Sequence, residues 1–314
     1  LHTAYRRQRQ MCIRDSSPPR SVIHDLGYRG FRGGRLGDGA ITLELYRNSV
    51  AQAFGIGRSG KAKIMPWLTI ALMALPAVVL GALSIQAAQA PAGMGTAPSN
   101  YFGYPYWTQL LITIFVATQA PVLFARDLRY RTIVLYFARP VSRTRFVLTR
   151  LAALTTAIFL VIITPMLVWF ACALSTGVDT GLHAKRFGAA LVGVAVLSLV
   201  LAAVSALVST LATKSGLALA AIIVVLMVPS AMITMALAIT FELQRDGIGQ
   251  LVASAHPFTA VAELVSGLFG DPPANATLPQ PEGWYVPLAV LVCVAWVAVP
   301  TAALVARIRS VASL

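Results

Sequence analysis

Long uncharged apolar runs alternate with short polar segments along most of the chain. Six runs of 19 to 27 residues contain no Asp, Glu, Lys, Arg or His. At 1.5 Å per residue, a helix of this length can cross a hydrocarbon core of about 30 Å. The runs are Met65–Ala88, Trp107–Ala125, Leu151–Leu174, Phe187–Ala212, Ser215–Phe241 and Tyr285–Ala306. The pattern predicts an all-α polytopic membrane protein with six transmembrane helices.

An amphipathic pattern precedes the first run. In Ala40–Gly55 the apolar residues fall at helical spacing and polar residues lie opposite; the apolar stripe is Leu43, Tyr46, Val50, Ala53 and Phe54. This arrangement, just before a span, is typical of an interfacial helix that lies flat on the membrane. We therefore expect a cytoplasmic N-terminal segment over residues 22–64 and a six-span domain over residues 65–314. Residues 1–21 differ in character and are interpreted as a non-native or disordered tail.

A broken apolar run lies between the last two spans. His256, Pro257 and Glu263 interrupt the apolar residues of Leu251–Phe269, so this run cannot cross a membrane by itself. Backbone that enters a bilayer without crossing it has to be covered by protein. The run therefore predicts one or two short re-entrant helices on the extracellular side.

Composition and charge set the class of protein and its orientation. The chain has 314 residues, of which 57% are hydrophobic and 11% are charged, whereas soluble domains carry about 25% charged residues. Of the 25 basic and 11 acidic residues, 22 and five fall on one predicted side, giving +17 there and −3 on the other. By the positive-inside rule we expect this side to be cytoplasmic and to hold both termini. This placement argues against nucleic acid as the partner of the basic residues.

A dense cluster of positive charge on the predicted cytoplasmic side lies in one loop between the second and third runs. The segment Arg126–Arg150 holds seven arginines and one acid. Its apolar residues Tyr130, Ile133, Val134 and Phe137 follow i, i+3, i+4, i+7 spacing, which predicts a short helix that ends before Pro140. An arginine-rich loop that only fixes the membrane topology explains the same residues equally well.

The chain has few residues that could catalyse a reaction or bind a metal or cofactor. The six runs contain no acidic or basic residues. Transporters coupled to protons or ions usually have such residues in the middle of the membrane, and membrane hydrolases need them as bases, nucleophiles or metal ligands, so both classes are disfavoured. The cysteines, Cys12, Cys172 and Cys293, have neither disulfide nor metal spacing. The sequence of Gly55–Ala62 nearly matches the phosphate-binding loop motif GxxxxGK(S/T). Ala62 stands where the motif has the Ser or Thr that binds Mg²⁺, so the favoured interpretation is a glycine turn with basic residues that anchor the first span. We expect no catalytic residue, cofactor or metal site on this chain.

The few polar and sulfur-containing residues of the spans are interpreted mainly as packing residues. Ser198, Ser205 and Ser209 share one helical face, as expected at a helix–helix contact. Other residues could line a path through the membrane, but packing is favoured for them too: Gln109, Thr113, Gln119, Met227, Met232 and Met235.

The loop sequence ARDLRYRTIVLYFARPVSR, Ala125–Arg143, resembles the permease subunit of type-2 ABC transporters. In that family the loop carries an acid and a basic residue, a Thr-Leu-like pair, then Arg/Thr-Pro-Val/Leu-Ser-Arg. Thr132-Ile133 departs from the Gly-Thr-Leu-like step. Gly27–Arg29 and Ala53–Arg58 are similar to N-terminal segments of actinobacterial members. The resemblance covers roughly residues 22–314 and also rests on the six spans and the N-terminal helix.

The resemblance implies that the loop forms a cytoplasmic coupling helix, which docks on a separate ATP-binding cassette ATPase subunit. ATP and Mg²⁺ would bind that subunit, and two permease copies or paralogues would form the complex. The residues implied for the docking contact are Asp127, Leu128, Arg131, Thr132, Leu135 and Arg139. For Arg143 and Arg145, binding to lipid phosphates at the membrane surface is held level with a role in coupling.

Two function classes follow from this reading. The first is a permease that has no ATPase activity of its own and moves substrate across the membrane, with export preferred. The alternative is a membrane anchor or assembly protein that transports nothing. A membrane-embedded enzyme is disfavoured because the spans hold no acid, base or metal ligand.

Overall fold

The computed structural model describes residues 37–90, 99–126, 142–212 and 214–311, and every regular element in these ranges is an α-helix. In chain order these helices are α2 (Asp38–Ala53), α3 (Gly60–Gln89), α4 (Gly103–Trp107), α5 (Gln109–Leu123), α8 (Arg143–Ser175), α9 (Thr180–Leu211), α10 (Ser215–Glu242), α11 (Asp246–Ala253), α12 (Pro257–Phe269) and α13 (Tyr285–Val311). The predicted all-α class is confirmed. The predicted tail, residues 1–21, lies outside the described residues.

Among the described residues, five helices are long and apolar enough to cross a membrane, namely α3, α8, α9, α10 and α13. The predicted second span is present as α5, a shorter apolar helix of 15 residues, about 22 Å long. A break at Thr108 separates α5 from α4. The Thr108 hydroxyl and backbone N–H both donate to the Tyr104 carbonyl, at 2.8 and 3.0 Å. The chain is therefore a multi-pass membrane protein, as predicted.

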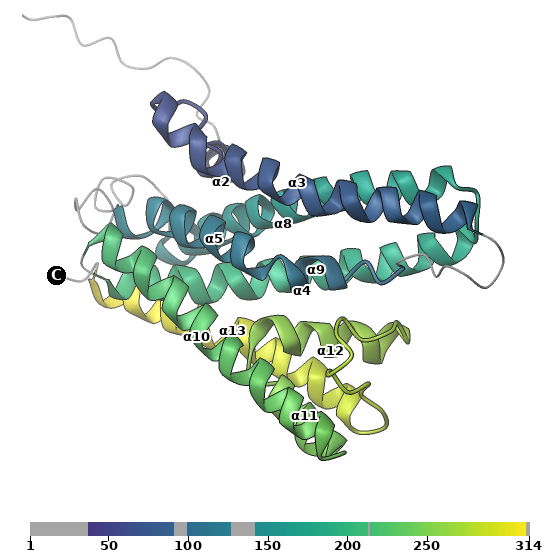
Figure 1. Cartoon of the computed structure of the whole chain (residues 1–314). Helices are drawn as coiled ribbons and strands as arrows, with labels where there is room; N and C mark the ends of the chain where they lie inside the picture. The colour runs from purple at the N-terminus through teal and green to yellow at the C-terminus, as the bar shows by residue number, and fades with distance from the viewer. Residues whose placement is uncertain (1–36, 91–98, 127–141, 213, 312–314) are drawn as a thin grey trace, which may run out of the picture. The chain divides into compact units, whose positions relative to one another are not determined.

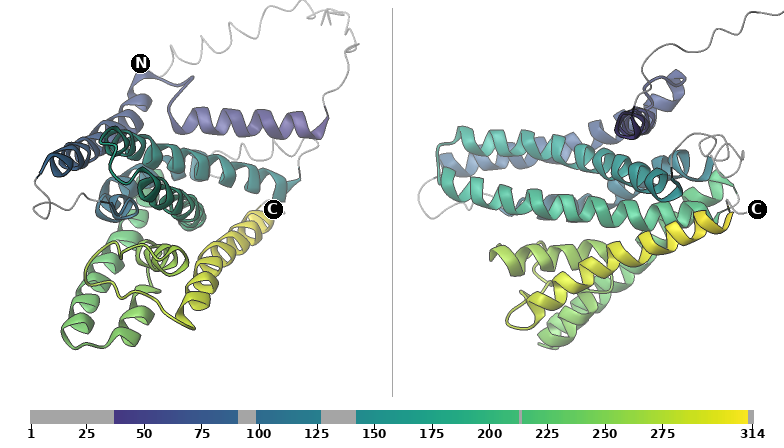
Figure 2. Two further views of the ribbon diagram at one scale, coloured as in Figure 1. Left: turned by 90° about the vertical axis from the view of Figure 1, so that its right-hand side faces the viewer. Right: turned by 180° about the vertical axis from the view of Figure 1, so that it is seen from behind.

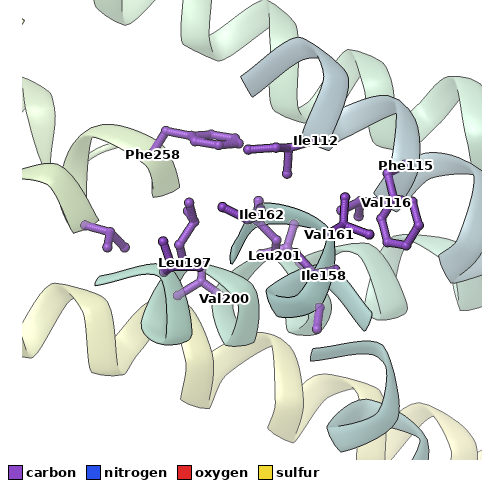
Figure 3. Packing of buried hydrophobic residues seen from close by; sticks show 14 of the residues in the cluster. Ile112, Phe115, Val116, Ile158, Val161, Ile162, Leu197, Val200, Leu201 and Phe258 are labelled. Atoms are coloured by element: carbon purple, nitrogen blue, oxygen red, sulfur yellow. The ribbon is translucent and has the colours of Figure 1, made fainter. Parts of the chain in front are cut away.

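Helix α9 lies at the centre of the packing, against α5, α8, α10, α12 and α13 (Figure 1). In the most apolar 18-residue stretch of α9, 61% of the residues are buried inside the protein. In the corresponding stretches of α10 and α13, 22% are buried. Branched and aromatic side chains from four helices meet in this core (Figure 3). Examples are Phe115 of α5, Ile162 of α8, Leu197 and Leu201 of α9 and Phe258 of α12.

The outer helices expose apolar side chains. Leu75 of α3 is 63% exposed and Met235 of α10 is 70% exposed, although both lie within candidate spans. Lipid tails are as apolar as these side chains, so a membrane surface does not penalise their exposure. The exposed faces of α3 and α10 are therefore suited to contact lipid or another membrane chain.

Helix α2 confirms the predicted N-terminal helix and packs along the first half of α8 (Figure 2). The Tyr46 and Thr156 hydroxyls form a hydrogen bond of 2.8 Å between the two helices. Within the predicted apolar stripe Ala53 is buried and Leu43 is 57% exposed, and the polar Ser49 is also buried. Small residues on the covered face allow the helix backbones to approach closely.

The broken run before the last span forms two short helices, α11 and α12, as predicted. Pro257 begins α12, a position at which its missing N–H and fixed φ fit the first helical turn. All ten residues of Pro257–Ser266 are buried, and α12 packs against α9 and α13. Protein therefore covers this segment, as a re-entrant helix requires.

Candidate functional site

The arginine-rich segment is described only at its two ends. The residues predicted to contact an ATPase lie outside the described part of the chain; they are Asp127, Leu128, Arg131, Thr132, Leu135 and Arg139. Their role stays a prediction. The structure describes the helix ends from which the segment departs and to which it returns, the C-terminus of α5 and the N-terminus of α8.

Helix α8 begins at Arg143, eight residues before the predicted start of the third span at Leu151. Ser142 caps it, because its side chain accepts a hydrogen bond of 3.3 Å from the Arg145 N–H. Arginine favours helix almost as strongly as leucine does, so a charged stretch can continue a helix that an apolar run began. Helix α8 therefore begins about two turns before the predicted third span, within the arginine-rich segment.

Arg150 lies within this added part of α8 and is only 1% exposed. Its Nη1 donates a hydrogen bond to the Leu123 carbonyl at the end of α5, and its guanidinium lies 4.7 Å from the centre of the Phe146 ring. A cation is favourable at a helix C-terminus, where carbonyl groups lack partners within the helix. Arg150 therefore links the two helices at the point where the arginine-rich segment departs.

The sequence prediction missed the role of Arg150, although a signal for it exists. Phe146, Arg150, Leu154 and Ile158 follow one another at four-residue steps and all are buried. Extending the apolar stripe of the third span backwards by two turns would have placed Arg150 on the covered face of the helix.

Arg143 and Arg145, the predicted lipid-binding arginines, both contact other parts of the chain. Arg145 Nη1 pairs with Asp38 Oδ2 of α2 at 2.9 Å, and 41% of the Arg145 side chain remains exposed. Arg143 Nη1 donates to the Arg309 carbonyl of α13 at 3.3 Å, and Arg309 Nη2 donates to Thr144 Oγ1 at 3.0 Å. These contacts gather α2, α8 and α13 at one end of the bundle. The lipid-binding role of the two arginines stays a prediction.

The glycine-rich stretch between α2 and α3 forms a turn. Gly55 has a φ of +71°, and a Cβ there would lie 2.7 Å from the Ala62 carbonyl oxygen, so only glycine fits this position. A helix precedes the turn, whereas a phosphate-binding loop follows a strand. This geometry supports the interpretation of a structural turn with basic anchors.

The serines of α9 are packing residues, as predicted. Ser198, Ser205 and Ser209 are fully buried, and each hydroxyl donates to a carbonyl of the same helix. Of the other span residues considered, Gln109 accepts a hydrogen bond from Ser230 of α10 at 2.9 Å. Met235 faces outwards. The favoured packing role therefore fits the serines and Gln109 but not Met235.

Two buried ionisable residues lie in and next to α12, outside the five candidate spans. Glu263 of α12 is 3% exposed and His256, at the N-cap of α12, is 2% exposed. His256 Nε2 is 2.9 Å from the Leu226 carbonyl of α10. Burial raises the pKa of Glu263 to about 8, and a hydrogen bond with the Ser254 side chain opposes this rise. Glu263 is therefore mainly neutral at pH 7.

Groups of His, Cys, Asp or Glu that could hold a metal ion do not occur among the described residues. Cys172 and Cys293 are free thiols. The part of the chain that the structure describes thus offers helix ends, arginines and packed polar residues. Such groups are suited to binding a partner or ligand and to holding helices together so that they move as a unit.

Comparison with protein families identifies the chain. Residues 83–305, about 70% of the sequence, match the family model described as ABC-2 family transporter protein. A comparison with curated proteins finds no match. The matched range begins within α3, ends within α13 and includes the whole arginine-rich segment. The chain therefore belongs to the ABC-2 family of transporter proteins, as a membrane component and not as the ATPase.

Proposed function

We propose that the chain is the permease subunit of an ABC exporter that moves substrate across the bacterial plasma membrane, using ATP hydrolysed by a separate ATP-binding cassette subunit. The observation that carries this proposal is the family match over residues 83–305. The uncharged apolar runs support it, because they hold no group that would couple transport to a proton or ion gradient. The driving energy then comes from a partner, on which ATP and Mg²⁺ bind.

In this proposal the arginine-rich segment is the part that receives the movement of the ATPase. The contact is made by Asp127, Leu128, Arg131, Thr132, Leu135 and Arg139. Support comes from the two helix ends, because α5 and α8 are both tightly packed and Arg150 joins them. Because the segment is attached at both ends to well-packed helices, a displacement caused by the ATPase would be transmitted to α5 and α8.

Two permease copies or paralogues form the complex, with both termini in the cytoplasm. The exposed apolar faces of α3 and α10 support association within the membrane. Arg143 and Arg145 face the phosphates of the inner leaflet, to which the part-exposed Arg145 side chain remains accessible.

Reconstitution in proteoliposomes tests the proposal. The chain would be combined with the ATP-binding cassette subunit encoded in the same operon, and ATP hydrolysis would be measured for each protein alone and for both together. We expect no hydrolysis by the chain alone and several-fold faster hydrolysis by the pair than by the ATPase subunit alone. Equal rates with and without the chain would favour the membrane-anchor alternative.

A further inference from the structure

A cavity of about 470 Å³ opens at the predicted cytoplasmic ends of three helices. Its walls come from the turn before α3 and the first residues of α3, the last turn of α5, and the first turns of α10. Helix α5 packs against both α3 and α10, so the cavity lies over α5 between these two candidate spans. None of the roles assigned above uses it.

Two arginines, Arg58 and Arg126, line the cavity. Partial burial lowers the pKa of Arg58, and the neighbouring positive charge of Arg126 lowers it further. Within the described ranges, neither arginine forms an ion pair with a carboxylate. Arginine stays protonated at any physiological pH, so this end of the cavity remains cationic and favours an anion between the two groups.

The rest of the cavity is largely apolar. Met65, Pro121, Val122 and Leu219 contribute to its lining. Met65 is 47% exposed, and its neighbour Leu68 on α3 is 48% exposed. The lining therefore continues into an outward-facing apolar surface of a candidate span, along which a hydrocarbon chain can lie.

We propose that this cavity binds an anionic phospholipid of the inner leaflet, with its phosphate between Arg58 and Arg126 and its acyl chains against the apolar wall and α3. Guanidinium groups bind phosphate oxygens through paired charge-assisted hydrogen bonds. A free phosphate ion would satisfy the two arginines but would leave the apolar wall uncovered. The apolar continuation onto α3 therefore favours a lipid over a soluble anion.

The site adjoins the arginine-rich segment, because Arg126 directly precedes Asp127. A bound phosphate would stabilise the position of Arg126 at the end of α5. The lipid proposal does not depend on the ATPase partner, so failure of one leaves the other standing.

Native mass spectrometry of the full-length chain in detergent, titrated with phosphatidylglycerol or phosphatidylcholine, tests the site. Each basic residue near an anionic lipid surface strengthens binding about fivefold. We therefore expect the double variant Arg58→Gln/Arg126→Gln to bind phosphatidylglycerol about 25-fold more weakly than the wild type. The control Arg47→Gln, which changes an exposed arginine of α2, should bind as the wild type does.

A second pair of variants keeps both arginines. Gly216 lines the cavity near the N-terminus of α10, and a Cβ there meets no atom within 4 Å. An acidic residue is favourable in the first turn of a helix, so Gly216→Glu should fold and supply an internal carboxylate to the arginines. We expect Gly216→Glu to weaken phosphatidylglycerol binding and the matched Gly216→Gln variant to do so much less.

Three outcomes would overturn the proposal. The first is unchanged phosphatidylglycerol binding in the double arginine variant. The second is phosphatidylcholine binding as tight as that of phosphatidylglycerol. The third is complete displacement of phosphatidylglycerol by millimolar inorganic phosphate, which would identify the site as one for a soluble anion.

Discussion

At the residue scale, Glu263 is a buried acid whose burial has a consequence for stability. It lies on α12 among residues that α9 and α13 cover. Burial disfavours the charged form of a carboxyl group, and this raises the pKa of Glu263 from its ordinary 4.5 to about 8. The folded chain therefore holds a proton on Glu263 over a pH range in which the unfolded chain has released it.

The contribution of Glu263 to the stability of the folded chain should consequently fall as the pH rises from about 4.5 to about 8 and then level off. The slope for one such group is about 1.4 kcal/mol per pH unit, because the folded state binds one proton more than the unfolded state. Glu263→Gln cannot ionise and should lose this decline. Thermal unfolding midpoints in detergent at pH 5, 7 and 9 measure the difference.

The exposed residue Glu282 provides the control for this prediction. Glu282→Gln should follow the pH dependence of the wild type. If Glu263→Gln and wild type show parallel curves between pH 5 and pH 9, the carboxyl group of Glu263 does not carry the buried proton.

Arg150 and Glu263 show what sequence reasoning cannot provide at this scale. Charge ends the predicted third span, which places Arg150 in a loop, and Glu263 enters the prediction only as an interruption of an apolar run. Each of the two side chains is nevertheless at least 97% buried. Burial of a charged side chain depends on partners far away in the sequence, such as the Leu123 carbonyl for Arg150. No local pattern contains those partners, although the stripe through Phe146 and Leu154 indicates the buried face.

At the scale of elements, hydropathy predicted which helices exist better than where they end. Helix α8 starts two turns earlier than the apolar run, and α9 starts at Thr180 instead of Phe187. An apolar run ends at the first charge, whereas a helix ends where hydrogen bonds or caps stop it. The break at Thr108, which leaves α5 with 15 residues, has no clear signal in hydropathy either.

The contact between α9 and α12 gives a test at this scale. A Cβ at Gly193 would lie 2.7 Å from the Phe102 ring and also too close to Val265 of α12. Gly193→Ala should therefore destabilise the fold by about 1–3 kcal/mol through overpacking. Thermal unfolding of the purified protein in detergent measures this change.

Gly188 is the matched control on the same helix, because a Cβ there meets no atom within 4 Å. Gly188→Ala should leave stability unchanged or raise it by up to about 1 kcal/mol, since alanine favours helix over glycine. Equal effects of the two substitutions would show that α9 and α12 do not approach each other at Gly193.

At the scale of the whole molecule, the sequence predicted the class and the family correctly. The membrane class followed from six long apolar runs, of which five are helices of spanning length, and the family is shown by the match over residues 83–305. The class and the family depend on the combined pattern of many residues, so an error at one helix boundary does not change their prediction. The proposed coupling contact would depend instead on a surface of another protein, which no pattern within this chain contains.

The central claim is that the arginine-rich segment binds an ATP-binding cassette subunit. Co-purification of that subunit with the tagged chain tests it most directly, comparing wild type with a variant carrying Arg131→Glu, Leu135→Glu and Arg139→Glu. The control reverses exposed charges elsewhere, with Arg47→Glu and Arg307→Glu. We expect the subunit to co-purify with the wild type and the control and to be lost from the membrane-inserted triple variant. Retention by the triple variant would contradict the claim.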